Sequence, residues 1–198
     1  VAFEGYKIAE TPFTNGQFKR LHKLKRDELL EIMPDAEGRL KRSLEISAEK
    51  TAELKLQSPM VCISEVEAEG IAKLLGMRLP SELERERAAA YTDGRSYPFG
   101  NKFDKNKVTF DDNGTRSVFA HKEGASPEGV LDLSGNIWEW TSSPYGEIDL
   151  SDPKNPKLPQ SGDLRVLRGG SWYDGIPEDL QAAYRINFHP ENRYDGVG

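Results

Sequence analysis

The sequence predicts an α+β fold in which helices come first and an irregular, loop-rich sheet region follows. Three observations predict it. Capping signals mark helix starts in the first half of the chain. From residue 91 onward, Gly, Pro, Asn and Asp recur between short apolar runs, which is typical of short strands joined by ordered loops. All 3 tryptophans lie in this second part, where large rings can anchor loops. We therefore expect helices first and a few short strands afterwards.

The first helical stretch, residues 19–56, is dense in charges of both signs and carries leucine and isoleucine at roughly helical intervals. Proline disfavours a helical conformation in the residue before it, so we expect one or two amphipathic helices that break near Met33-Pro34-Asp35. A mixed-charge run is typically a solvated face, with a partner surface as the alternative. We interpret this stretch as a charged helical insertion.

Capping boxes give the helix starts in chain order. In such a box, a Ser or Thr and a Glu or Gln three residues later satisfy each other's free backbone amides. The boxes are Thr14 with Gln17, Ser64 with Glu67, and Ser81 with Glu84. Gly76 is suited to end the second of these helices in a left-handed conformation. With the charged stretch, about three to five helices are expected.

Length and composition exclude several classes of protein. A chain of 198 residues, 36% of them hydrophobic, can form one sizeable core, so we expect a single domain over residues 1–198. The single cysteine, Cys62, cannot make an internal disulfide. A net charge of −6 argues against a nucleic-acid partner, because phosphate contacts need clustered Lys and Arg.

The sequence gives no sign of a membrane segment. No apolar stretch approaches the roughly 20 residues that span a bilayer. Val1 is not followed by the basic flank and apolar block of a signal peptide. We expect a soluble protein without membrane insertion, and its cellular location stays open.

A series of motifs runs through the chain in a consistent order. They are Pro59–Ser64, Ala72–Glu82, Tyr97–Asn101, Gly135–Thr141 and Arg168–Trp172, followed by Tyr184-Arg185 and Asn192-Arg193. Together they resemble the formylglycine-generating enzyme, or sulfatase-modifying factor, superfamily over nearly the whole chain. The resemblance implies a C-type-lectin-like fold of that type, irregular and loop-rich.

Two enzyme branches of this superfamily imply residues that are missing here. One branch oxidises cysteine with copper held by a cysteine pair just after the Gly-Gly-Ser-aromatic motif, but residues 171–185 contain no cysteine. Thiolates are the ligands that select monovalent copper. The iron-dependent sulfoxide synthases use histidines, and His22, His121 and His189 are far apart in this sequence. We expect a protein that is not an enzyme and requires no cofactor. A metal-dependent oxidoreductase and a structural accessory subunit are the alternatives.

The C-terminal segment, residues 167–198, is similar to the variable region of diversity-generating retroelement variable proteins. Motif residues such as Trp172, Arg185 and Arg193, which we expect to be structural, frame three short islands. The islands are Tyr173-Asp174-Gly175, Ile186-Asn187-Phe188-His189 and Tyr194-Asp195-Gly196.

The chemistry of the islands suits recognition. Tyrosine gives stiff contact area, and Asp, Asn and Gly give adaptable polar contacts, as in antibody paratopes. The resemblance therefore implies a non-catalytic protein whose variable surface binds a protein or another macromolecular ligand, and ordinary loop residues are the alternative. The expected ligand-binding residues are Tyr173, Asp174, Gly175, Ile186, Asn187, Phe188, His189, Tyr194 and Asp195.

The resemblance also implies a structural calcium at the Gly135–Thr141 motif. The family's calcium-ligand positions correspond here to the side chains of Asp132 and Glu139 and to the backbone of Gly135 and Ile137. Carboxylate and carbonyl oxygens are the ligands that calcium prefers. In the alternative interpretation, Glu139 only accepts hydrogen bonds from loop amides.

Overall fold

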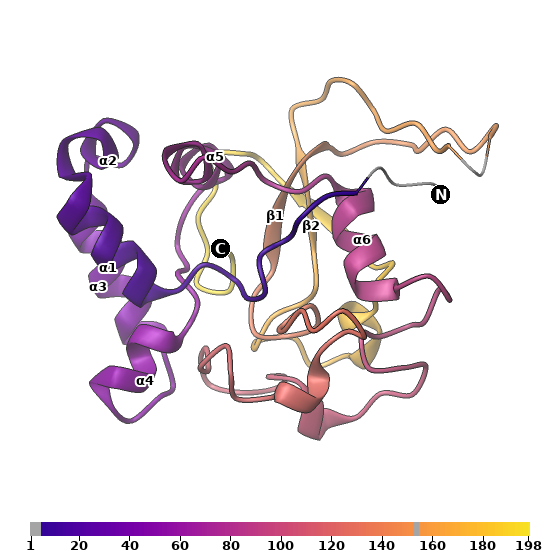
Figure 1. Cartoon of the computed structure of the whole chain (residues 1–198), viewed down its shortest axis with the longest axis horizontal. Helices are drawn as coiled ribbons and strands as arrows, with labels where there is room; N and C mark the ends of the chain where they lie inside the picture. The colour runs from indigo at the N-terminus through magenta and orange to yellow at the C-terminus, as the bar shows by residue number, and fades with distance from the viewer. Residues whose placement is uncertain (1–4, 153–154) are drawn as a thin grey trace.

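Helices fill the first half of the chain and strands the second half in the computed structural model, which describes residues 5–152 and 155–198 (Figure 1). Val1, on which the signal-peptide expectation rests, lies outside the described residues. The helices are α1 (Asn15–Leu24), α2 (Arg26–Ile32), α3 (Ala36–Ile46), α4 (Ala52–Gln57), α5 (Glu65–Leu74) and α6 (Glu82–Ala90). The strands are β1 (Glu139–Pro144), β2 (Arg165–Arg168) and β3 (Arg185–Phe188). The α+β class is confirmed.

The described residues contain more α-helices than the three to five expected, because the charged stretch is divided more than once. The break at Met33-Pro34-Asp35 separates α2 from α3 as predicted. Two further breaks, at Lys25 and after Ile46, were not signalled by proline. At Lys25, a backbone of φ −134° and ψ 50° interrupts the helix between α1 and α2.

All three capping boxes form. In α1, α5 and α6 the hydroxyl at the cap accepts a hydrogen bond from the amide three residues later, and the Gln or Glu there accepts one from the cap amide. Gly76 follows α5 with φ +70°, the left-handed conformation that a side chain would disfavour. These local signals therefore fix where α1, α5 and α6 begin and where α5 ends.

The helices α1 to α4 gather at one end of the molecule, and the sheet with α6 lies at the other (Figure 1). A single buried cluster nevertheless joins the two ends. It includes Phe18 and Leu29 from the helices and Trp140 and Leu167 from the sheet. The charged stretch therefore presents its charges outward and packs its apolar residues into the main core.

The sheet is antiparallel in the order β1-β2-β3. Arg168 of β2 and Arg185 of β3 are direct partners in the register. Like charges opposite one another destabilise a sheet, but Glu82 of α6 accepts a hydrogen bond from each guanidinium, at 3.1 and 3.0 Å. This buried carboxylate fastens α6 across the two strands.

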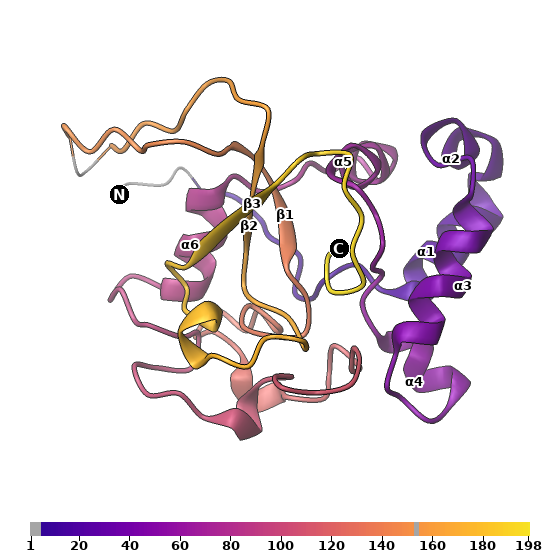
Figure 2. The same ribbon diagram turned by 180° about the vertical axis from the view of Figure 1, so that it is seen from behind.

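The C-terminal loop lies between the sheet and the helices α1 to α4, as Figure 2 shows from behind. Residues Gly196 to Gly198 run beside β1, where the amides of Trp138 and Trp140 donate to the carbonyls of Gly196 and Gly198. Within the described part of the chain, α3 is the longest helix with 11 residues, and none is long and apolar enough to cross a membrane.

Candidate functional site

Residues from all three islands surround one open cavity of about 750 Å³. Each island contributes at least two of its residues to the walls. These are Tyr173 and Asp174, Ile186 and Phe188, and Tyr194, Asp195 and Gly196. The fold therefore brings together three segments that are separate in the sequence.

Three of the expected ligand-binding residues do not line the cavity. Asn187 lies between Ile186 and Phe188 on β3, and successive side chains of a strand point to opposite faces, so it faces away. His189 is exposed just beyond the strand, and Gly175 is exposed in the loop after Asp174. These three residues lie outside the cavity wall, and their part in ligand binding stays a prediction.

Other wall residues were not among the sequence-based candidates. Trp138 precedes β1, Asp179 lies in a short 3-10 helix, Pro177–Leu180, and Tyr184 precedes β3. Trp172, which was expected to be structural, lines the cavity as well. Three of these residues belong to motifs that carried the family resemblance: Trp138, Trp172 and Tyr184. The sequence therefore indicated a structural role for them and gave no sign that they line a binding site.

Aromatic rings form the cavity walls in contacting pairs. The ring centroids of Trp138 and Tyr184 are 6.1 Å apart, and those of Trp172 and Tyr173 are 5.6 Å apart. Phe188 and Tyr194 approach to 4.5 Å. Tyr173 is 78% exposed and Tyr194 44%, so both rings are available for contact with a ligand.

The loop of the first island is held by backbone and carboxylate hydrogen bonds. The Asp174 carboxylate accepts from the Ser171 amide at 2.6 Å and from its hydroxyl at 3.0 Å. Burial raises the pKa of Asp174, which the two Ser171 bonds oppose. The amides of Asp111 and Asp112 donate to the carbonyls of Asp174 and Trp172. This arrangement leaves the Tyr173 ring free while its backbone is fixed.

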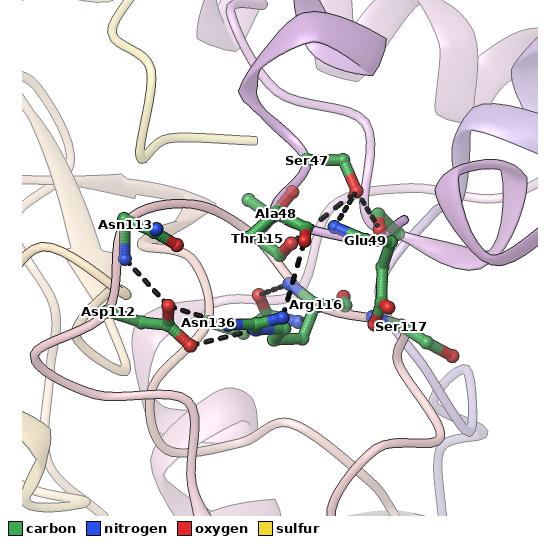
Figure 3. A network of polar contacts seen from close by, with 10 residues as sticks. Ser47, Ala48, Glu49, Asp112, Asn113, Thr115, Arg116, Ser117 and Asn136 are labelled. Atoms are coloured by element: carbon green, nitrogen blue, oxygen red, sulfur yellow. Dashed lines mark hydrogen bonds and ion pairs between the residues drawn. The ribbon is translucent and has the colours of Figure 1, made fainter. Parts of the chain in front are cut away.

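A network of polar contacts joins Asp112, Arg116 and Asn136 (Figure 3). Asn136 is fully buried, and its side chain bonds to both the amide and the carbonyl of Arg116, at 3.0 Å each. Arg116 in turn makes two 2.8 Å bonds to Asp112. Because the Trp172 amide donates to the Asn136 carbonyl, the network extends to the cavity wall.

The third island is tied to the helices by ion pairs. The Asp195 carboxylate accepts two hydrogen bonds from Arg42 of α3 and one from the Cys62 thiol at 3.2 Å. Arg193 donates to both oxygens of the buried Glu67, at 2.9 Å each, in agreement with a structural role. Burial, helped by the bond to Asp195, raises the pKa of Cys62 to about 12. Asp195 thus serves the scaffold as well as the wall.

The carboxylates expected to bind calcium have other partners. Glu139 accepts a 2.6 Å bond from the guanidinium of Arg85, a fully buried residue, which also donates to the Leu133 carbonyl. Asp132 accepts a 2.9 Å bond from Asn136. Calcium at Asp132, Gly135, Ile137 and Glu139 remains a prediction, and a metal ion at Glu139 would share that carboxylate with Arg85.

Side chains that could hold a transition metal are dispersed. Within residues 5–152 and 155–198, no three His, Cys, Asp or Glu side chains come together as a metal site would require. His121 bonds to the Asn106 carbonyl at 2.9 Å, and His22 lies near Glu37 on the helical side. His189 is exposed at the end of β3. The histidines therefore do not converge on the cavity.

The sequence matches the Sulfatase-modifying factor enzyme 1-like domain over residues 1–198. The chain belongs to this family. Members with similar sequences carry different names. Inactive C-alpha-formylglycine-generating enzyme 2 from Bos taurus is 36% identical, covering 73% of this chain and 50% of its own. Hercynine oxygenase from Mycobacterium tuberculosis is 33% identical, covering 71% and 36%.

A third relative, Serine/threonine-protein kinase pkn1 from Chlamydia pneumoniae, is 35% identical over 67% of this chain and 22% of its own length. The chain therefore spans between about a fifth and a half of the length of these relatives. The match assigns this domain to its family. The full-length relatives carry different names.

Solved structures of the family type share this fold. Treponema denticola variable protein 1 superposes with a TM-score of 0.71 at 20% identity, covering 96% of this chain and 81% of its own. PvdO from Pseudomonas aeruginosa gives a TM-score of 0.70 at 19% identity, covering 96% and 76%. The C-type-lectin-like fold of the formylglycine-generating type is thereby confirmed.

Proposed function

We propose that this domain is a non-catalytic binding module that displays a variable C-terminal surface, as the variable proteins of diversity-generating retroelements do. Its ligand is a protein or another macromolecule. The observation that carries the proposal is the convergence of the three islands on one aromatic-walled cavity. Loops held on a rigid scaffold commonly carry binding function, and large rigid rings are efficient contact residues.

The contacts divide the island residues into two kinds. Asp174 and Asp195 bond to Ser171 and Arg42, so they hold the loops as well as facing the cavity. The rings of Tyr173 and Tyr194 project further into solvent, with ring contacts to Trp172 and Phe188. We expect ligand specificity to depend mainly on the projecting rings, which can change without loss of the scaffold.

A metal-dependent oxidoreductase is the second candidate, favoured by the 33% identity to Hercynine oxygenase. The dispersed histidines and the absence of a cysteine from residues 171–185 weigh against it. Turnover of a thiol substrate by the purified chain with added copper or iron would support this candidate over the binding module.

Selection from a random peptide library tests the binding proposal while the natural ligand is unidentified. A dodecapeptide phage library is panned on the full chain, and the affinity of each selected peptide is measured for three proteins: the wild type, a Tyr173→Ala/Tyr194→Ala double variant and a Leu24→Ala control. Leu24 is 69% exposed on α1, away from the cavity. We expect the double variant to weaken binding by about tenfold or more, since aromatic anchors commonly contribute over 1 kcal/mol each, and the control to match the wild type.

Two results would overturn the binding proposal. One is selected peptides that bind the double variant as tightly as the wild type. The other is a library that yields no binder. Circular dichroism of the double variant separates loss of contact from loss of fold.

The genome offers an independent test of the retroelement origin. We expect a reverse transcriptase gene and an imperfect copy of the segment encoding residues 167–198 near this gene, with differences at adenines. If the locus contained neither the reverse transcriptase gene nor the imperfect copy, the retroelement origin would be rejected. The proposal that the domain is a binding module would remain.

A further inference from the structure

The charged residues of the cavity wall fall into two groups, those with an ionic partner and those without. Asp195 is paired with Arg42, and Arg193 is paired with Glu67. Their charges are therefore balanced locally. Asp174 and Asp179 also line the cavity, and neither forms an ion pair with any of the residues that the structure describes.

The groups beside these two aspartates are neutral. Asp174 accepts hydrogen bonds from the amide and hydroxyl of Ser171. Burial raises the pKa of Asp174, and the bonds from Ser171 and the nearby Trp138 side chain oppose this. The charge of Asp179 raises the pKa of the neighbouring Tyr184. The wall of the cavity therefore carries negative charge that no cation within the described part of the chain pairs with.

The rings around these aspartates favour the same kind of ligand. Trp138 and Tyr184 form one contacting pair, and both line the same cavity as the two carboxylates. The face of an aromatic ring is negative and attracts a cation within about 6 Å of its centroid. Rings and carboxylates thus act in the same direction on a positively charged group.

We propose that the cavity binds an alkylammonium group of the ligand, between the rings of Trp138, Trp172 and Tyr184 and the carboxylates of Asp174 and Asp179. This inference rests on the proposed function, because it specifies the ligand chemistry of the same cavity. A volume of about 750 Å³ accommodates a lysine side chain or a quaternary ammonium head with neighbouring atoms of the ligand. A bound cation also stabilises the ionised form of Asp174, which burial disfavours.

A pair of isosteric small molecules tests the inference directly. Choline carries a trimethylammonium group, and 3,3-dimethylbutan-1-ol has the same shape without the charge. Each is titrated into the full chain at constant ionic strength while tryptophan fluorescence is recorded, since Trp138 and Trp172 both lie in the wall. We expect choline to bind at millimolar concentration and the neutral compound to bind about tenfold more weakly or not at all.

Two variants locate the effect. Asp179→Asn keeps the size of the side chain and removes one charge, so we expect choline to bind several-fold more weakly while the neutral compound is unaffected. Asp163→Asn is the matched control, because Asp163 is exposed and lies outside the cavity wall. Its choline affinity is expected to equal that of the wild type.

The inference is overturned if the two compounds bind equally, if neither binds up to about 50 mM, a ceiling well above the millimolar affinity expected of a cation–π site, or if Asp179→Asn leaves choline binding unchanged. These outcomes are separable from failure of the proposed function. Selected peptides that depend on Tyr173 and Tyr194, together with no preference for choline, would retain the binding module and remove the cationic ligand. Choline selectivity without peptide binders would do the reverse.

Discussion

Replacement of Glu82 by Gln tests how the cavity's scaffold is held. Glu82 is fully buried, and its two oxygens accept hydrogen bonds from Arg168 at 3.1 Å and from Arg185 at 3.0 Å. Glutamine has nearly the same size but no charge. Its amide can accept from one guanidinium, and its NH₂ group then faces the other without a bond.

The expected loss follows from breaking a buried ionic contact while its partners stay in place. Removal of one member of such a pair costs about 3 to 5 kcal/mol, because the remaining charges are left uncompensated. Arg168 keeps a second carboxylate, Glu86 at 2.7 Å, and a bond to the Ala182 carbonyl at 3.0 Å, which places the loss toward the lower end. For a chain of this length, 1 kcal/mol shifts the melting temperature by about 2 to 4 °C, so Glu82→Gln should lower it by about 6 to 12 °C.

Urea unfolding followed by circular dichroism measures this loss, with thermal melts in parallel. Two controls bracket the result. Glu86→Gln removes a partly exposed partner of Arg168 and should cost about 1 kcal/mol, because water replaces part of the contact. Glu69→Gln removes an exposed pair with Lys73 and should stay within about 0.5 kcal/mol of the wild type. A Glu82→Gln variant as stable as the Glu69→Gln control would show that the buried carboxylate does not hold the two arginines.

Three further predictions concern single contacts. Dialysis against EDTA should leave the melting temperature within about 1 °C of the calcium-loaded protein, because Arg85 already supplies the positive charge at Glu139; a loss of several degrees that calcium restores would contradict this. Cys62 should react slowly with iodoacetamide at pH 8 in the folded chain and rapidly in urea, since a pKa of about 12 keeps it a thiol; equal rates would count against its burial. Hydrogen bonds from Arg78 lower the pKa of Glu84 to about 2, so its contribution to stability is present above pH 4.5 and is lost as the pH falls toward 2; Glu84→Gln should flatten the acid limb of a stability profile, and an unchanged limb would refute the assignment.

The parts of the fold that were predictable are those set by neighbouring residues. A capping box needs only four consecutive positions, and all three boxes form. The break before Asp35 follows from the covalent geometry of Pro34. The break at Lys25 has no comparable local cause, which is why the charged stretch contains more helices than expected.

The site was only partly predictable, because its geometry depends on long-range contacts. The resemblance to the variable region of retroelement variable proteins marked the islands, but the face to which Asn187 points depends on the register of β3 against β2. Asp179 enters the wall through a 3-10 turn that no sequence signal marked. The ion pair of Glu139 with Arg85, 54 positions away, could not be inferred from either local sequence.

We propose above that a ligand binds in the cavity formed by the three islands. Hydroxyl-radical footprinting with a selected peptide measures this at the side chains themselves, since Tyr173, Tyr184 and Tyr194 are all at least 40% exposed in the free chain. Tyr145, 40% exposed, and Met77, 51% exposed, lie outside the cavity wall and serve as internal controls. We expect the peptide to protect the three cavity tyrosines and to leave Tyr145 and Met77 unchanged. Unchanged oxidation of the cavity tyrosines in the presence of a saturating peptide would contradict it.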